Sequence, residues 1–187
     1  MINNLNIIIT GTTSGIGNEL AKKFLDGGNN VWGCGRKENN INKSNYFHTK
    51  IDLSDSKKIE DWLKKIEQET KRKIDILVVN AVNYERKLNS LDSLDSISKT
   101  INVNLTASML LTKTISKFMI QKKAGLIVFF SSVASILNEI GTSSYASSKA
   151  GLETFSKIIK KELETFNIKV ATLRILYIPT NLSKKLN

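Results

Sequence analysis

The sequence predicts an α/β fold: a doubly wound parallel sheet with helices on both of its faces, in three layers. Short apolar runs of strand length alternate along the 187 residues with longer segments in which apolar residues recur at helical spacing. Two strands separated by a helix form a parallel pair, so this alternation favours a parallel sheet. No linker, repeat or low-complexity stretch interrupts it, and we expect residues 1–187 to form one domain.

The individual elements follow from the pattern in order. Apolar runs bounded by glycine or polar residues predict six strands, at 5–10, 29–35, 45–53, 74–80, 125–132 and 168–176. Helical spacing between them predicts four helices, at 17–28, at about 55–70, at about 96–121 and at 144–166. Ser54 or Asp55 can cap the second helix. The fourth strand is almost wholly apolar, which is typical of a strand buried on both faces.

The charge of the chain is strongly positive but dispersed. The formal net charge is +11, from 28 lysine and arginine residues against 17 acidic residues. The lysines lie on the polar faces of the expected helices, and no basic run is interleaved with aromatic residues. We therefore interpret the charge as a solvated lysine-rich surface and expect no nucleic-acid partner.

The chain contains one cysteine, Cys34, and one histidine, His48. A single cysteine excludes an internal disulfide, and this pair alone cannot form a zinc site, so we expect no metal. We interpret His48 as a structural or surface residue. No segment approaches the run of about 20 apolar residues that spans a bilayer, and no signal segment is visible, so we expect no membrane association and a cytoplasmic location.

A glycine-rich segment, TGTTSGIG at residues 10–17, connects the first strand to the first helix. In that context Gly11 permits a tight turn, Gly15 lets the backbone approach a pyrophosphate, and Gly17 lets the helix pack closely. The N-terminus of the helix then presents free N–H groups to phosphate. The glycine spacing differs from the G-x-G-x-x-G of many dinucleotide folds, and the segment also lacks the Lys-Ser/Thr of a P-loop, which argues against ATP hydrolysis.

A second motif, YASSKAG at residues 145–151, places Tyr145 four residues before Lys149. On a helix these two residues share one face. A nearby ammonium favours tyrosinate, so we expect Lys149 to lower the pKa of the Tyr145 phenol and make it usable as a general acid or base.

Together, the glycine spacing and the later Tyr-x-x-x-Lys resemble the short-chain dehydrogenase/reductase family, over about residues 5–182. Three further stretches fit in order: VVNAV at 78–82, NVNL at 102–105, and a serine thirteen residues before Tyr145. The resemblance implies a Rossmann fold and a catalytic tetrad of Asn104, Ser132, Tyr145 and Lys149.

The family also implies a role for each member of the tetrad. Tyr145 would protonate the alkoxide formed from a carbonyl substrate, and Ser132 would donate a hydrogen bond to the carbonyl oxygen. Lys149 would also hold the ribose of the nicotinamide, and Asn104 would support a water that links the lysine to solvent. The cofactor would carry the hydride.

The end of the second strand indicates which cofactor is preferred. Family members specific for NAD end this strand with an acidic residue, but here Gly35 is followed by Arg36 and Lys37. A guanidinium can pair with a 2′-phosphate, so we expect NADP(H) to be preferred over NAD(H). The resemblance implies these cofactor-binding residues: Gly11, Thr13, Ser14, Gly15, Ile16, Gly17, Arg36, Asp52, Leu53, Asn80, Ala81, Tyr145, Lys149 and Thr180.

The sequence departs from the family pattern near its end. Ile175 and Leu176 stand where the family has Pro-Gly, although Thr180 keeps a threonine position. Because the chain ends at Asn187, we expect the substrate lid and seventh strand of the family to be missing. The resemblance implies a homodimer or homotetramer formed through the helices that carry Asn104 and Tyr145.

Three functions remain open. The first is an NADPH-dependent reductase of a ketone or aldehyde, similar to the reductases of 3-oxoacyl groups on an acidic carrier protein. The second is a reductase of a sugar, polyol or other small carbonyl compound. The third is a nucleotide-binding regulatory or scaffold protein with impaired turnover. The substrate cannot be identified, but its pocket is expected between Val82 with the loop after it, residues 134–140, and the residues beyond Ile175.

Overall fold

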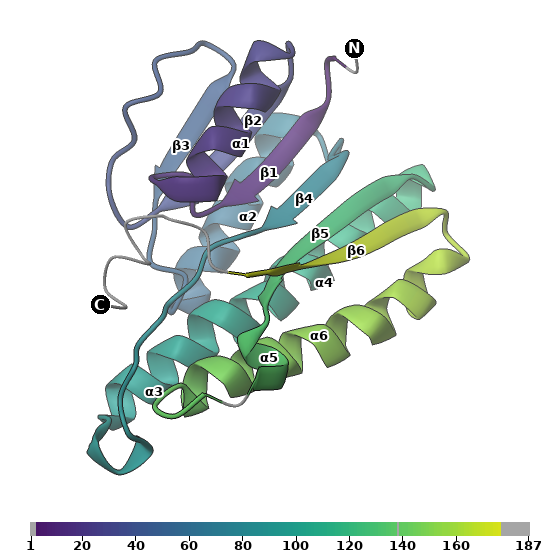
Figure 1. The fold of residues 1–187 in the computed structure, drawn as a ribbon. Helices are drawn as coiled ribbons and strands as arrows, with labels where there is room; N and C mark the ends of the chain where they lie inside the picture. The colour runs from purple at the N-terminus through teal and green to yellow at the C-terminus, as the bar shows by residue number, and fades with distance from the viewer. Residues whose placement is uncertain (1–2, 138, 177–187) are drawn as a thin grey trace.

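The computed structural model describes residues 3–137 and 139–176 (Figure 1). Six parallel strands form one sheet in the order β3-β2-β1-β4-β5-β6. The strands are β1 (Asn6–Thr10), β2 (Asn30–Gly35), β3 (Tyr46–Lys50), β4 (Ile76–Val79), β5 (Gly125–Ser132) and β6 (Ile168–Ile175). The order reverses direction between β1 and β4, and this is the point at which such sheets bind their ligands.

The helices connect successive strands. They are α1 (Gly15–Asp26), α2 (Ser56–Thr70), α3 (Leu94–Ile101), α4 (Ala107–Lys122), α5 (Ala134–Leu137) and α6 (Ser143–Glu164), with a 3₁₀ turn η1 (Asn89–Leu91) and a π turn η2 (Asn102–Thr106). Asp55 caps α2, because its carboxylate accepts hydrogen bonds from the N–H groups of Lys57 and Lys58.

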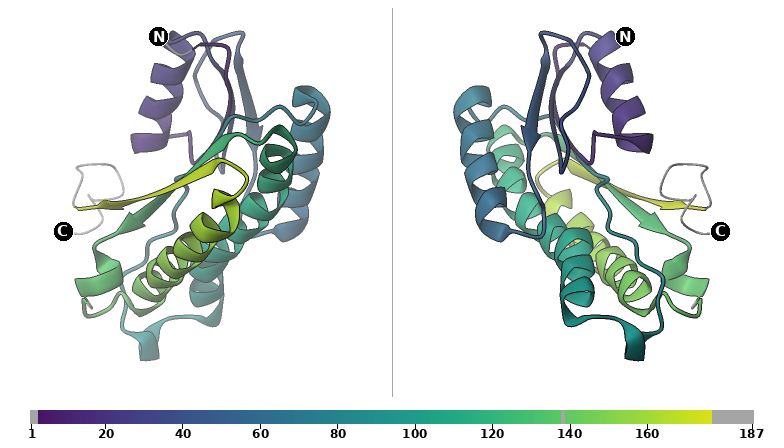
Figure 2. Two further views of the ribbon diagram at one scale, coloured as in Figure 1. Left: turned by 90° about the vertical axis from the view of Figure 1, so that its right-hand side faces the viewer. Right: turned by 90° about the vertical axis from the view of Figure 1, so that its left-hand side faces the viewer.

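The expected three-layer arrangement is confirmed. Helix α1 covers one face of the sheet, and α2, α4 and α6 cover the other (Figure 2). Side chains of Ala21 and Leu25 on α1 pack against alternate residues of β1, whereas the larger core on the opposite face includes Trp62, Leu111 and Leu152. Residues 7–9 of β1 are fully buried because the sheet is covered on both faces there.

One expected helix differs from the structure. The helix predicted at about 96–121 is divided into α3, η2 and α4, with the π turn at its centre. A π turn accommodates one extra residue within a helix and keeps the apolar spacing almost intact, so the periodicity reads as one helix. The short elements η1 and α5 were not predicted, because three or four residues are too few to show a period.

Within residues 3–137 and 139–176, no helix is both long enough and apolar enough to cross a membrane. The same residues contain no group of three or more His, Cys, Asp or Glu side chains that could hold a metal ion.

Candidate functional site

The glycine loop between β1 and α1 is packed too closely for side chains at two positions. Gly11 has φ +76°, and a Cβ there would lie 2.9 Å from the Cα of Ala81. A Cβ on Gly17 would lie 2.3 Å from the carbonyl oxygen of Gly11 and 2.5 Å from Nδ2 of Asn80. The loop and the start of α1 therefore fold onto the end of β4 in a way that only glycine permits.

Asn80 and Ala81 hold the loop in that position. Both backbone N–H groups donate to Oγ1 of Thr10, at 3.0 and 2.9 Å. Nδ2 of Asn80 also donates to the carbonyl oxygen of Thr10 at 2.9 Å and to that of Gly11 at 3.3 Å. The structure thus brings together the predicted cofactor residues of the first and fourth strands, at the reversal point of the sheet.

The N-terminus of α1 has the properties of an anion site. Ser14 occupies the N-cap position, but its side chain makes no capping hydrogen bond, and the first turn carries no acidic residue. This first turn contains Gly15, Ile16 and Gly17. It follows directly from the part of the glycine loop that contains Thr13. Free N–H groups and the positive end of the helix dipole favour a phosphate at this place.

The loop after β2 is held by a chain of hydrogen bonds that begins at the glycine loop. Oγ1 of Thr12 lies 2.8 Å from the hydroxyl of Tyr46, which lies 3.0 Å from Nδ1 of His48. Nε2 of His48 lies 2.9 Å from the carbonyl oxygen of Lys37. Arg36 is exposed and forms no ion pair with any other described residue. The structural role expected for His48 is thus specific: it fixes the backbone next to Arg36.

Asp52 and Leu53 follow β3 on the same edge of the sheet. Oδ1 of Asp52 accepts hydrogen bonds from the N–H and hydroxyl of Ser54, at 3.0 and 2.9 Å, and Oδ2 lies 3.3 Å from the ammonium of Lys99. Burial acts to raise the pKa of Asp52, but these hydrogen bonds and the charge of Lys99 bring it below its ordinary value. The side chain of Leu53 is buried in the core.

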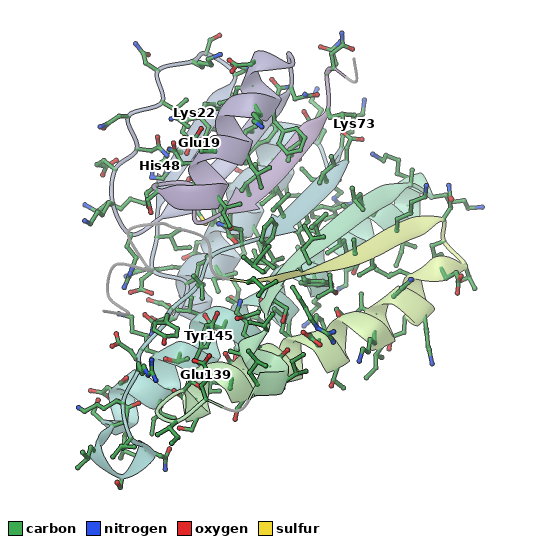
Figure 3. All side chains as sticks on the ribbon, viewed as in Figure 1. Glu19, Lys22, His48, Lys73, Glu139 and Tyr145 are labelled. Carbon is green, nitrogen blue, oxygen red and sulfur yellow. The ribbon has the colours of Figure 1, made fainter. Side chains whose placement is uncertain are left out.

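Ser132, Tyr145 and Lys149 meet at the end of β5. Tyr145 is 9% exposed, and Ser132 lies close enough to act on the pKa of its phenol through hydrogen bonding. The hydroxyl of Ser132 also accepts from the N–H of Ala134 at 3.2 Å. The ammonium of Lys149 donates to the carbonyl oxygen of Phe130 at 2.7 Å and lies 6.0 Å from the centre of the Tyr145 ring. Tyr145 is labelled in Figure 3, beneath the carboxyl ends of the strands.

The direction expected for the pKa of Tyr145 was wrong. Burial raises the pKa of the Tyr145 phenol above its ordinary value and outweighs the hydrogen bond with Ser132, which acts to lower it. Burial also lowers the pKa of Lys149 to about 8. The spacing of four residues places both side chains on one helix face, but it reveals neither how deeply they are buried nor that the amine turns toward a backbone carbonyl.

Asn104 lies in the π turn η2 and is 1% exposed. Its Oδ1 accepts from the N–H of Asn83 at 2.8 Å, and its Nδ2 donates to the carbonyl oxygen of Asn83 at 2.9 Å and to the hydroxyl of Ser148 at 3.0 Å. That hydroxyl donates to the carbonyl oxygen of Tyr145 at 2.6 Å. These contacts join the segment after β4 to α6, whereas the resemblance implies a link from Asn104 to Lys149 through water.

Two residues of the loop after Val82, which the sequence predicts to border the site, have contacts there that the sequence did not predict. The ring of Tyr84 packs edge-on against the ring of Tyr145, with centroids 4.8 Å apart and planes at 78°. Asn83, which pairs with Asn104, also donates through Nδ2 to the hydroxyl of Thr100 at 3.0 Å. Their place after a buried strand predicts that they border the site, but their partners lie on distant helices and could not be identified from the sequence.

The loop after β4 lies against the chain immediately after residues 134–140, the second segment expected to border the substrate. The N–H of Lys87, in the loop after β4, donates to the carbonyl oxygen of Gly141 at 2.7 Å, just before α6. Glu139, labelled beside Tyr145 in Figure 3, belongs to this second segment. Thr180, which the resemblance implies to bind the cofactor, lies outside the described residues, as does residue 138 of the segment 134–140.

The sequence profile of a known family, described as short chain dehydrogenase, matches residues 5–187. The chain is 33% identical over 186 residues to 3-oxoacyl-(acyl-carrier-protein) reductase FabG of Buchnera aphidicola, covering 96% of this chain and 76% of that protein. It is 32% identical over 194 residues to dehydrogenase/reductase SDR family member 7B of Xenopus laevis, covering 95% of this chain and 59% of the relative. A solved structure of 4-hydroxyisoleucine dehydrogenase complexed with NADH and succinate superposes with a TM-score of 0.90 at 30% identity, covering 96% and 79% of the two chains.

Proposed function

Because the chain belongs to the short-chain dehydrogenase/reductase family, we propose that it transfers a hydride between NADP(H) and a carbonyl or alcohol substrate, with Tyr145 as the general acid or base. One observation carries this proposal. Ser132 and Tyr145 lie together at the carboxyl end of β5, close enough for Ser132 to act on the pKa of the phenol, and on the same edge of the sheet as the glycine loop.

The described residues fit a dinucleotide. The loop closes on Ala81 without room for side chains at Gly11 and Gly17, and α1 offers uncapped N–H groups to a pyrophosphate. We propose that Thr13, Ser14, Gly15 and Ile16 hold the phosphates, and that Asp52, Leu53, Asn80 and Ala81 border the adenosine and its ribose. A bound nicotinamide supplies the hydride.

The protein's own groups would position the substrate and supply the proton. Ser132 donates a hydrogen bond to the substrate oxygen, and Tyr145 gives its proton to the same oxygen as negative charge develops there. The raised pKa of Tyr145 keeps the phenol protonated and ready to donate at neutral pH. The ammonium of Lys149, over the face of the phenol ring, favours that charge electrostatically. Asn104 positions Tyr145 through Ser148.

We propose NADP(H) as the preferred cofactor because Gly35 leaves the end of β2 without an acidic side chain, next to the exposed Arg36.

Replacing Arg36 with alanine is expected to weaken NADPH binding at least about tenfold and to leave NADH binding within about twofold, because only NADPH has a 2′-phosphate for the guanidinium. Titration of the intrinsic fluorescence measures both affinities. Lys73→Ala removes a cation at the opposite end of the sheet (Figure 3) and should change neither. Equal weakening of both cofactors by Arg36→Ala would contradict the assignment.

The titration of Lys149 predicts the pH dependence of reduction. Its pKa of about 8 means that the ammonium is present at neutral pH and is lost as the pH rises, while Tyr145 stays protonated. We therefore expect the rate at saturating substrate to fall between about pH 7 and about pH 9. Lys149→Arg keeps its charge throughout this range, so its residual activity should show no such fall. A flat wild-type profile would argue against a charged Lys149 in the rate-limiting step.

We propose further that the substrate is a small ketone or aldehyde, free or carried on an acidic protein, as the name of the FabG relative suggests. The chain is expected to pair with itself through α4 and α6, which expose Met109 and Ile158 on their surfaces, at 38% and 51%. The cytoplasmic location expected from the sequence stays a prediction.

A further inference from the structure

A buried carboxylate lies behind the proposed catalytic residues and has no place in the mechanism above. Glu153 is on α6, one turn beyond Lys149 and two beyond Tyr145, and is 6% exposed. Its Oε1 accepts from the hydroxyl of Ser131 at 2.9 Å and from Nε of Arg174 at 2.8 Å, and its Oε2 accepts from Nη2 of Arg174 at 2.6 Å.

A further hydroxyl connects this carboxylate to Ser132. Oγ of Ser135, on α5, lies 2.8 Å from Oε1 of Glu153 and 2.8 Å from the carbonyl oxygen of Ser132, so its single proton can be donated to either. Ser131 adjoins Ser132 on β5. The carboxylate is therefore linked to the backbone on both sides of the Ser132 side chain.

The partners of Glu153 come from three elements whose positions relative to one another shape the site. Ser131 is on β5, Ser135 is on α5, and Arg174 is on β6, immediately before Ile175 and Leu176, which replace the Pro-Gly of the family pattern. Glu153 itself lies on α6, the helix that carries the phenol. No other described carboxylate bonds to three separate elements around the site.

The charge of Glu153 is secured by its partners. The guanidinium of Arg174 and the two serine hydroxyls hold the pKa of the carboxyl at about 2, against the effect of burial. The carboxylate is buried, whereas the side chain of Arg174 is 46% exposed. Removing a carboxylate from water is costly, and an ion pair with an exposed partner adds little net stability. The presence of the pair is better explained by its geometry than by a contribution to stability. A bidentate pair is strongly directional, so it fixes α6 and β6 relative to each other.

We propose that Glu153 and Arg174 are positioning residues, which fix the Ser132 hydroxyl against Tyr145 and hold the end of β6 at the edge of the site. The inference rests on the proposed function. It predicts that breaking the pair misplaces Ser132 and leaves the glycine loop, on the far side of β4, undisturbed.

Two variants test the pair. Glu153→Gln keeps the shape and removes the charge, and Arg174→Met keeps the length and removes the donors. Each is expected to lower kcat by about tenfold or more while the Kd for NADPH stays within about twofold. The double variant should be no slower than the slower single variant, because the effects of residues that act as a unit are not additive.

Asp75→Asn is the matched control. The carboxylate of Asp75 accepts from the N–H of Asn6 at 2.8 Å and pairs with Lys122 at the amino end of the sheet. Its loss should therefore lower Tm and leave kcat unchanged.

A second readout does not depend on turnover. The hydrogen bond with Ser132 acts to lower the pKa of Tyr145. Both variants should therefore raise that pKa in a titration of ¹³C-labelled tyrosine by NMR, with Tyr145→Phe identifying the signal. If the pKa of Tyr145 and kcat are both unchanged in Glu153→Gln and Arg174→Met, the positioning role is wrong. If wild-type protein binds NADPH but reduces no carbonyl compound, the proposed function fails, and the NMR titration still decides the role of the pair.

Discussion

Tyr145→Phe is expected to lower kcat/KM for carbonyl reduction by about 10²- to 10⁴-fold, the range in which a positioned general acid contributes. The substitution removes one oxygen and keeps the ring that packs edge-on against Tyr84, so the pocket and the fold should be preserved. NADPH affinity should stay within about twofold, because the variant keeps Lys149 and the whole glycine loop. Steady-state kinetics with NADPH and a panel of ketones and aldehydes measures kcat/KM, and fluorescence titration measures the affinity for NADPH.

Tyr84→Phe is the matched control for this experiment. It removes the hydroxyl of the neighbouring ring, which is not bonded to Ser132 in the structure, and should change kcat/KM far less. A wild-type protein that binds NADPH but is indifferent to Tyr145→Phe would favour a nucleotide-binding regulatory or scaffold protein.

Gly17→Ala is expected to abolish measurable NADPH binding and to destabilise the fold by about 1–3 kcal/mol. The added methyl would meet the backbone carbonyl of Gly11 at 2.3 Å, so either the loop or the start of α1 must move. Because the phosphates would be held by that loop and that helix end, a small displacement removes several hydrogen bonds at once. Thermal unfolding and NADPH titration measure the two effects.

Gly27→Ala controls for the general effect of replacing glycine with alanine next to α1, because Gly27 is the C-cap residue of that helix. Gly27 has φ −78°, which any residue adopts, and a Cβ there would lie 3.2 Å from Nδ2 of Asn29, a side-chain atom. We expect stability and NADPH affinity close to wild type. Gly17→Ala behaving like Gly27→Ala would mean that the glycine loop is more adaptable than its packing indicates.

Local patterns in the sequence predicted most of the fold. The cap at Asp55 and all six strands depend on residues close in sequence, and each was found within a few positions of its place. The glycines were also predictable, because Gly11 and Gly17 serve a turn and a close approach that recur wherever a strand leads into a phosphate-binding helix.

Features that depend on distant partners could not be predicted in the same way. The link from His48 to Lys37 crosses from β3 to the loop after β2, and Glu153 gathers serines and an arginine from three other elements. The pKa of Tyr145 has the same origin: its direction is set by burial, which the helix carrying it does not reveal. The sequence predicted the residue types of the site, and the packing between elements determined their electrostatics.

The most direct test of the central claim is a titration of purified protein with NADPH and then with NADH. Energy transfer from Trp32 and Trp62, which are 6% and 3% exposed, to the reduced nicotinamide reports binding. We expect NADPH to bind at least about tenfold more tightly than NADH, a difference of about 1.4 kcal/mol. Binding of neither cofactor would contradict it, because the glycine loop, Arg36 and Lys149 would then not form a working cofactor site.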